Sequence, residues 1–298
     1  MPEASSFLSQ FSDSLSGLAA SARPFLAGVR TRDGHRLSGT LWKPNAVVVS
    51  EQILPDTSDY EVQVEDVVAN AHVAGRDQGT NVAVLRLERE FPGLLPPVAS
   101  PRVGALALVL GTGENGPSAR LAIQRIVGGA WQSLAGGTID HRIVLDTHMG
   151  WSEEGGPVLA ADGSILGIST RGARRQTLVI PAATVEGVAT QLLQKGSVER
   201  GSLGLALQAV ALPETLRAHE SQHTGLMVMG VVAGGPAAKA GIVAGDILLE
   251  VGGVPITRPR QIGRQLGTNS IGQKLEIKLA RAGAIVASEV TIEMRKAG

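Results

Sequence analysis

The chain has 298 residues, of which 43% are hydrophobic and 18% are charged, a composition typical of globular proteins rather than disordered ones. Its 27 basic and 27 acidic residues give a formal net charge of zero, so no basic field favours nucleic acid or an anionic membrane. The absence of cysteine excludes disulfides, thiolate catalysis and cysteine-ligated metals. No apolar run approaches the roughly 18 residues of a membrane-spanning helix, and no signal-peptide layout is visible, which predicts a cytoplasmic protein without a membrane span.

The first element in chain order is predicted to be an amphipathic helix. Ser5 or Ser6 is placed to cap it and Pro24 to stop it. We assign residues 1–24 to this helix, which either packs on the domain that follows or contacts another subunit of an oligomer. Its apolar residues recur mostly three and four positions apart: Phe7, Leu8, Phe11, Leu15, Leu18, Ala19 and Ala22.

Residues 25–196 have the pattern of a two-lobed β domain. Short segments rich in Val, Leu and Ile alternate with Gly, Pro, Asn and Asp, first over residues 25–95 and again over residues 105–180. A proline-rich connector over residues 91–101 separates the two sets, and helical spacing over residues 182–193 predicts a closing helix. Two β lobes with a stiff connector resemble the chymotrypsin-like double β-barrel, so we expect a mainly β fold.

One loop in the second lobe carries the strongest functional signal. It reads Gly-Trp-Ser-Glu-Glu-Gly-Gly-Pro over residues 150–157 and precedes a strand pair around an Asp162-Gly163 turn. This stretch resembles the nucleophile loop of trypsin-like serine proteases of the HtrA/Deg family, and the resemblance covers nearly the whole chain. In that family the residue directly before the Gly-Gly-Pro is the nucleophilic serine, whereas here it is Glu154.

The other two triad positions of that family are also replaced. The family's histidine follows a strand like the one at residues 47–50, and the matching position holds Gln52; its aspartate opens a strand like that at residues 80–85, and the matching position holds Asn81. A glutamine amide has no useful basicity, an asparagine favours the wrong imidazole tautomer, and Glu154 cannot be acylated as a serine can. The resemblance with these replacements predicts no catalytic residue, and therefore a pseudoprotease that is not an enzyme.

The loop around the nucleophile position is interpreted as a vestigial oxyanion loop. Glycines allow backbone N–H groups to converge there, and Glu154 would be their natural occupant. The residues assigned to this loop are Ser152, Glu153, Gly155 and Gly156.

Two alternatives to a pure pseudoprotease remain open. A residual or rebuilt serine-type endopeptidase would need a nucleophile outside the family's position. A metal-binding scaffold would use the vacated cleft with His148, Glu153 and Glu154 as weak candidate ligands, although their spacing is no recognised metal signature. The main prediction contains neither a metal nor a cofactor.

A short charged linker, residues 197–200, leads to a separate module over residues 201–298. This module contains, in order, Pro-Ala-x-x-Ala-Gly at residues 236–241, Gly-Asp at 245–246 and Gly-Gly-x-Pro at 252–255. The combination resembles the PDZ domains of HtrA-type proteins. The resemblance implies an α+β domain that binds peptides.

The same resemblance predicts where a peptide binds. A loop at the start of the module would offer N–H groups to the peptide's terminal carboxylate, and the strand after it would pair with the peptide backbone. A helix after Pro259 would form the second wall, so a hydrophobic C-terminal residue is expected on the ligand; the open alternative is that the apolar residues fill the core and the groove is closed. The predicted groove residues are Ser202, Leu203, Gly204, Leu205, Ile262 and Leu266.

The function expected from these features is that of a non-catalytic scaffold or regulatory subunit. It would hold a protein partner through the PDZ groove, the degenerate cleft or both, without nucleic acid. The family resemblance implies a homotrimer, to which the N-terminal helix would contribute. The resemblance also makes the periplasm the alternative to the cytoplasm.

Overall fold

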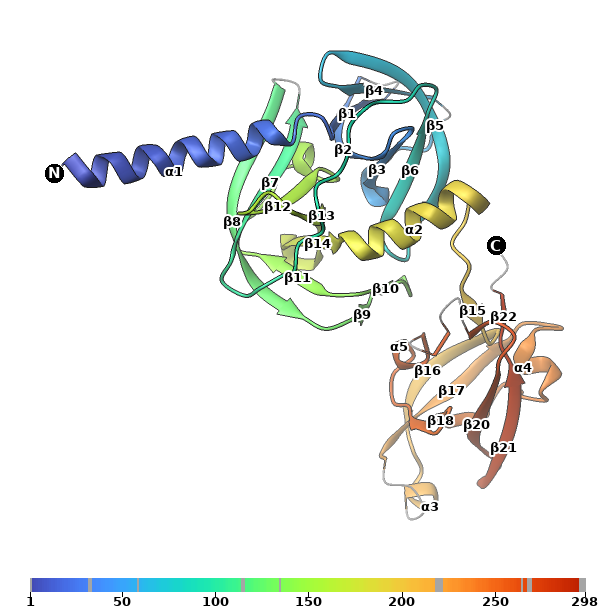
Figure 1. Ribbon diagram of the computed structural model, residues 1–298. Coiled ribbons are helices and arrows are strands. Elements are labelled where there is room, and N and C mark those ends of the chain that lie inside the picture. Colours follow the sequence, from blue (N-terminus) through green and yellow to red (C-terminus); the bar gives the residue numbers. More distant parts are fainter. Residues whose placement is uncertain are drawn as a thin grey trace. The chain divides into compact units, whose positions relative to one another are not determined.

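The computed structural model describes residues 2–31, 34–57, 59–113, 116–133, 135–217, 222–263, 265–266 and 270–294. The chain forms two compact units, Met1–Val198 and Glu199–Gly298 (Figure 1). Within the described ranges, no helix combines the length and the apolar character needed to cross a membrane.

The predicted N-terminal helix is confirmed as α1, Pro2–Ser21. Its contact with the rest of the unit lies near its C-terminal end, where Leu18 and Ala19 pack on the main core. Farther back, Phe7 is 65% exposed, and its ring stacks on Phe11 at a centroid separation of 6.3 Å. The helix therefore packs on its own domain only at one end, and most of its apolar face is open.

The first lobe is a closed six-stranded barrel with the order β1-β2-β3-β6-β5-β4. Strand β3 is buried at all five residues: it pairs with β2 and β6, contacts β13 of the second lobe, and contributes to the main core. The strands are β1 Leu26–Arg30, β2 Arg36–Lys43, β3 Ala46–Ser50, β4 Tyr60–Val64, β5 Val67–Asp77 and β6 Val82–Leu87.

The second lobe is another closed barrel, with the order β11-β14-β13-β12-β7-β8, so the predicted double barrel is confirmed. A small hairpin, β9 Trp131–Gln132 with β10 Thr138–Ile139, is attached to it. The barrel strands are β7 Leu106–Gly113, β8 Gly116–Gly128, β11 Arg142–Leu145, β12 Pro157–Ala160, β13 Ile165–Arg171 and β14 Thr177–Pro181.

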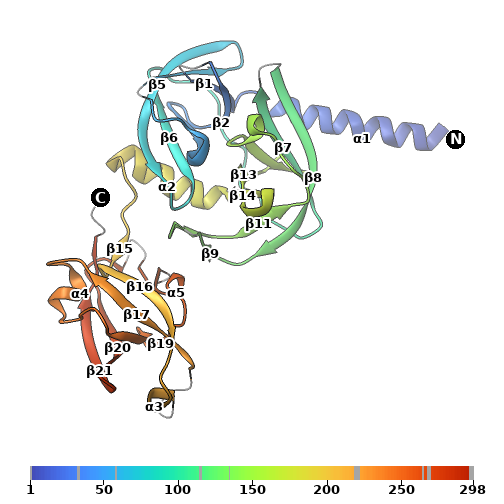
Figure 2. The ribbon, with the colours of Figure 1, turned by 180° about the vertical axis from the view of Figure 1, so that it is seen from behind.

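Helix α2, Ala182–Lys195, ties the second lobe to the first, and it lies beside β5 and β6 in both views (Figure 1 and Figure 2). It buries Val185 and Leu192 in the core of the first barrel. Glu186 accepts hydrogen bonds from the Trp42 indole at 2.8 Å and from Lys43 at 2.6 Å. Gly196 ends the helix in the left-handed conformation at φ 72°, which favours glycine.

The second unit is built on a sheet with the order β16-β17-β18-β20-β21, in which β19 also pairs with β18. Strand β16 lies at one edge of this sheet and pairs only with β17 among the described strands. Strands β15 Gly201–Ser202 and β22 Glu293–Met294 form a separate pair. The remaining elements are β16 Leu205–Ala211, α3 Glu214–Arg217, β17 Thr224–Val231, α4 Pro236–Lys239, β18 Ile247–Val251, β19 Val254–Pro255, α5 Arg260–Gly263, β20 Lys274–Arg281 and β21 Ala284–Thr291.

The Gly245-Asp246 turn of this unit has a structural role. Asp246 is 1% exposed and accepts hydrogen bonds from Arg281 at 2.8 and 2.7 Å and from the backbone of Val243 at 2.9 Å. The Arg281 hydrogen bonds, helped by that of Val243, lower the pKa of the Asp246 carboxyl, against the effect of burial. The pair anchors β20 to the turn before β18.

This lowered pKa predicts an acid sensitivity. The unfolded chain takes up the Asp246 proton first, near an ordinary pKa of about 3.9, so the stabilisation is present above that pH and is lost as the pH falls further. We expect the difference in unfolding free energy between the protein and Asp246→Asn to shrink as the pH falls below about 4. Urea unfolding at a series of pH values measures it, and a constant difference from about pH 6 to about pH 3 would contradict the assignment.

Candidate functional site

The structure brings the three positions Gln52, Asn81 and Glu154 together where the two lobes meet. Gln52 lies in a short 3-10 turn directly after β3, Asn81 precedes β6, and Glu154 follows a second 3-10 turn, Trp151–Glu153. The backbone N–H of Gln52 donates to Asn81 Oδ1 at 2.8 Å, and Gln52 Nε2 donates to Glu154 Oε1. The three side chains are therefore linked in one hydrogen-bonded series across the two barrels.

Glu154 is the centre of this network and its side chain is fully buried. Besides Gln52, its Oε1 accepts from Ser50 Oγ at 3.0 Å and Thr170 Oγ1 at 3.1 Å. The backbone N–H of Arg171 adds a further bond at 3.1 Å, and the Arg171 guanidinium forms an ion pair with Oε2 at 3.2 Å. A buried carboxylate costs several kcal/mol unless it is paired and hydrogen-bonded. Here Oε1 accepts the hydrogen bonds, while Oε2 has the Arg171 ion pair but no hydrogen-bond partner among the described residues.

Asn81 is held in a left-handed conformation at φ 60°, which asparagine tolerates better than most residues. Its Nδ2 donates to Ser50 Oγ at 3.0 Å and to Thr170 Oγ1 at 2.5 Å. The preceding turn is organised by buried Asp77, which accepts from the backbone and hydroxyl of Thr80 at 3.0 and 2.6 Å. Asn81 therefore both orients Gln52 and closes the network around Glu154.

Glu153 points away from Glu154. Its carboxylate accepts three hydrogen bonds from Arg120 on β8, at 2.9 to 3.2 Å, and one from the Gly150 N–H at 2.8 Å. Its backbone carbonyl accepts from Ser169 Oγ at 2.6 Å. Glu153 is thus a buried anchor that sets the path of the loop, a role its position in the sequence did not indicate.

The predicted oxyanion loop is closed by its own backbone. The N–H groups of Glu154 and Gly156 donate to the carbonyls of Trp151 and Glu153, at 3.3 and 3.2 Å, and Gly155 N–H donates to Ser169 at 2.9 Å. Gly155 is required here, because its φ is 89° and an added Cβ would lie 2.5 Å from the Ser38 carbonyl. These N–H groups are used to shape the loop rather than aimed at a common point.

One member of the network, Arg171, stacks on an aromatic ring. The guanidinium of Arg171 sits 3.8 Å from the ring centroid of Trp151, and the Trp151 side chain is 68% exposed. Such cation–π stacking is worth about 0.5–2 kcal/mol, depending on desolvation. The sequence did not indicate Arg171 or its contact with Trp151, because no sequence pattern links the two residues.

The other candidates from the loop lie apart from the network. His148 is exposed, and Ser152 is half-buried with its carbonyl accepting from Ser38 Oγ. In the part of the chain that the structure describes, no group of three His, Asp or Glu residues is arranged to hold a metal ion.

In the second unit, the six predicted groove residues divide between the core and the surface. Leu203 and Ile262 are 3% and 4% exposed and belong to the core, whereas Leu205 and Leu266 are half-buried against it. The Gly204 N–H, expected to be free for a carboxylate, donates to Ser202 Oγ at 3.0 Å. Of the four apolar side chains in the predicted groove, those of Leu205, the first residue of β16, and Leu266 are thus the two that are partly exposed.

Two domain families match this arrangement: a trypsin-like peptidase domain over residues 37–168 and a PDZ domain over residues 227–281. The fold and the site thus define a trypsin-like domain followed by a PDZ domain. The two matched domains, the relatives and the structural neighbours together support the HtrA/Deg family.

Among curated proteins, the probable periplasmic serine endoprotease DegP-like of Brucella suis is 29% identical over 259 residues, covering 83% of this chain and 50% of that protein. The putative serine protease HhoB of Synechocystis sp. is 29% identical over 252 residues, covering 79% of this chain and 60% of that protein. The chain thus spans about half the length of the first of these and somewhat more of the second.

Among solved structures, HtrA-type protease AlgW with a decapeptide has a TM-score of 0.77 at 20% identity, covering 95% of this chain and 99% of that one. The serine endoprotease from Yersinia pestis has a TM-score of 0.74 at 23% identity, covering 94% and 98%. At these identities the likeness shows the shared fold.

These comparisons contradict the prediction that the chain is not an enzyme. The relatives and structural neighbours are named as serine endoproteases and HtrA-type proteases, which points to an enzyme. The prediction rested on three side chains, Gln52, Asn81 and Glu154, whereas the match extends over most of the chain.

Proposed function

We propose that this protein captures polypeptides through its PDZ domain and works as a scaffold or regulatory subunit of the HtrA/Deg family. The observation that carries the proposal is the open edge of β16, whose first residue, Leu205, is half-buried against the same core as Leu266. An edge strand presents unpaired backbone groups that an extended peptide can pair with, and flanking apolar side chains select the side chains of that peptide. The related fold of AlgW has been solved with a decapeptide and with a tripeptide, which supports the same use here.

The proposal predicts binding of peptides that end in a hydrophobic residue. Calorimetric titration of the full chain with a decapeptide ending in valine should show binding, and the same peptide with a C-terminal amide should bind more weakly. Leu205→Gln should weaken the free-acid peptide about tenfold, because it removes an apolar contact of the groove. Val254→Gln, a half-exposed position on β19, is the matched control and should bind as the parent does. Equal binding by Leu205→Gln and the parent would place the peptide elsewhere.

A second candidate function is that of a serine-type endopeptidase, which the printed names of the relatives favour. Incubation of the protein with casein, followed by mass spectrometry of the products, tests it directly. Cleavage that persists in Glu154→Ala would show that the nucleophile lies outside the network. Cleavage that is lost in that variant, while circular dichroism shows the variant still folded, would assign the chemistry to the network itself.

The assembly and the compartment belong to the same proposal. The open apolar face of α1 around Phe7 and Leu8 supports a homo-oligomer, with the trimer that the family resemblance implies as the expected state. The relatives named as periplasmic favour that compartment over the cytoplasm predicted from the sequence. Analytical ultracentrifugation of the full chain measures the oligomeric state, and fractionation of the host cell identifies the compartment.

A further inference from the structure

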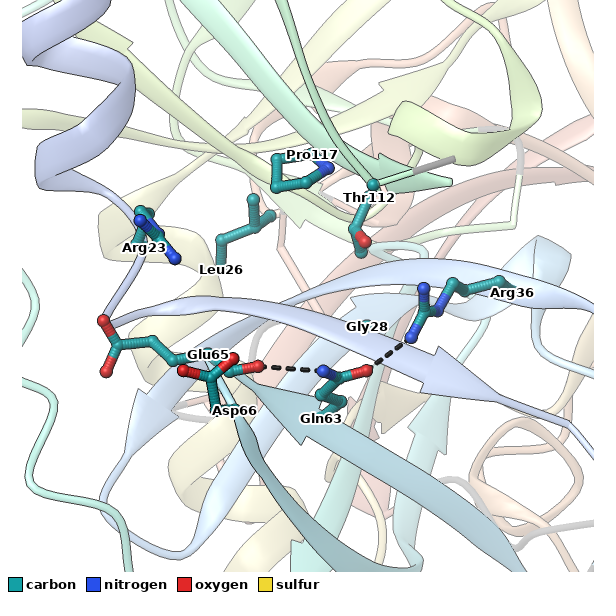
Figure 3. A pocket seen from close by; sticks show the side chains of 10 residues that line it. Arg23, Leu26, Gly28, Arg36, Gln63, Glu65, Asp66, Thr112 and Pro117 are labelled. Carbon is teal, nitrogen blue, oxygen red and sulfur yellow. Dashed lines mark hydrogen bonds between the residues drawn. The ribbon is translucent and has the colours of Figure 1, made fainter. Parts of the chain in front are cut away.

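A cavity of about 220 Å³ on the trypsin-like unit is bordered by Arg36 and Gln63 (Figure 3). The guanidinium of Arg36 already donates to Gln63 Oε1 and to the Gly113 carbonyl, and its Nε is buried. The donors of Arg36 are therefore either used or covered, and a ligand in this cavity would find no open charge there. The second unit differs, because it carries an arginine that is exposed.

Helix α5 lies beside the edge strand β16 in both views of the molecule (Figure 1 and Figure 2). The turn after α5 is tied to the start of the domain, because the Gly201 N–H donates to the Leu266 carbonyl at 3.0 Å. Ile262 of α5 is buried in the core against which Leu207 of β16 also packs. The segment therefore follows the core face of β16, with Leu266 toward the start of that strand and Arg258 farther along it.

Arg258 precedes α5, and its backbone is held in place. The side chain of Gln261 accepts hydrogen bonds from the N–H groups of Thr257 and Arg258, both at 2.7 Å. Ile256, two residues earlier, is fully buried in the core. The Arg258 side chain is exposed, and its guanidinium has no hydrogen bond or ion pair with the residues that the structure describes. An anionic partner could bind it without breaking an existing contact.

The strands beside this arginine carry no charge of their own. The seven residues of β16, Leu205–Ala211, and the eight of β17, Thr224–Val231, include neither an acidic nor a basic side chain. The sequence places a second arginine, Arg260, at the first position of α5. A peptide paired with β16 would therefore meet positive charge on the side of α5, which favours an acidic ligand.

The spacing of side chains along a strand determines which ligand residues reach Arg258. Side chains of a peptide strand alternate between two faces, so the last residue and those two and four before it share the face toward α5. A peptide strand rises about 3.3 Å per residue, and a helical segment about 1.5 Å. Residues 258–266 therefore span about 12 Å, the length of between three and four peptide residues.

We infer that Arg258 selects peptides with an acidic side chain two or four residues before their C-terminus. The inference rests on the peptide binding proposed above and names the preferred ligand, a segment with a hydrophobic last residue and aspartate or glutamate at those positions. The guanidinium would donate charge-assisted hydrogen bonds to that carboxylate. Acidic residues one or three positions before the end would point to the opposite face and gain less.

The test is calorimetric titration of the full chain with three decapeptides that end in valine. The first carries aspartate two and four residues before the C-terminus, the second carries asparagine at the same positions, and the third carries aspartate one and three residues before it. The first peptide should bind about fivefold more tightly than the second, and the third should bind about as the second does. In about 0.5 M salt the advantage should shrink, because salt screens exposed charges.

Two arginine variants identify the residue responsible. Arg258→Gln should abolish the advantage of the first peptide and leave binding of the asparagine peptide unchanged, which also shows that the groove is intact. Arg125→Gln removes the same charge from an exposed position of the trypsin-like unit and should keep the advantage.

Three results would overturn the inference: an advantage that survives in Arg258→Gln, a third peptide that binds as tightly as the first, or an asparagine peptide that binds as tightly as the first. Each of these leaves peptide capture itself intact. Absence of binding by all three peptides would overturn peptide capture together with the inference.

Discussion

Replacing Glu154 with alanine should lower the free energy of unfolding of the trypsin-like unit by about 3–5 kcal/mol. The substitution leaves the Arg171 guanidinium without its ion-pair partner and removes the acceptor used by Ser50, Gln52 and Thr170. Breaking a buried pair costs more than the pair contributes, because the remaining charge and donors stay buried. Denaturant unfolding followed by tryptophan emission measures the change, since all three tryptophans, Trp42, Trp131 and Trp151, lie in this unit.

Two further variants identify the cause of that loss. Glu90→Ala removes an exposed carboxylate of the same unit and should change the unfolding free energy by less than about 0.5 kcal/mol. Glu154→Leu combined with Arg171→Met removes both charges and should recover at least half of the loss. If the double variant is no more stable than Glu154→Ala, the ion pair with Arg171 is not what holds the network.

The second prediction concerns chemistry at the same site. The triple variant Gln52→His, Asn81→Asp and Glu154→Ser should hydrolyse a fluorogenic peptide about a hundredfold faster than the parent. The expectation follows from the contacts already present: Asn81 Oδ1 bonds the backbone of residue 52, and the side chains of residues 52 and 154 touch directly. The second of these is the contact between base and nucleophile in a triad, and the first places residue 81 beside residue 52, where a triad has its orienting acid.

The matched control is Glu154→Ser alone. It supplies a hydroxyl without a base and should gain less than about tenfold over the parent, because members of a triad act as a unit. A serine-reactive fluorophosphonate should label the triple variant at position 154. A triple variant no faster than the single one would show that the closed loop, whose Glu154 and Gly156 N–H groups are bonded within it, limits catalysis instead.

Much of the fold was predictable because its signals are local. The alternation of β-rich segments with Gly, Pro and Asn predicted two β lobes, and three- and four-residue spacing predicted α1 and α2. How much of α1 contacts the rest of the domain was not predictable, because the sequence pattern of an apolar stripe is the same whether the stripe is packed against the domain or exposed to solvent. Only the packed structure shows that Leu18 and Ala19 are in contact while Phe7 and Leu8 are exposed.

The candidate site was predictable by position but not by contact. The Gly-Gly-Pro motif and the strands before Gln52 and after Asn81 indicated three positions that the structure then brings together. The partners that neutralise or anchor the two glutamates, Arg171 and Arg120, carry no motif. Their roles depend on which strands become neighbours when the barrels close.

The sequence by itself determined the order of the domains and the chemical character of the three positions, since residue types and short motifs do not depend on folding. Only the tertiary structure determines which groups compensate the charge of Glu154. Its hydroxyl donor Ser50 lies 104 residues away on the other barrel, and Gln52 lies 102 residues away. Donors so far from Glu154 in the sequence reach its carboxylate only after both barrels have formed. The buried charge is tolerated because the folded chain then supplies its hydrogen-bond and ion-pair partners.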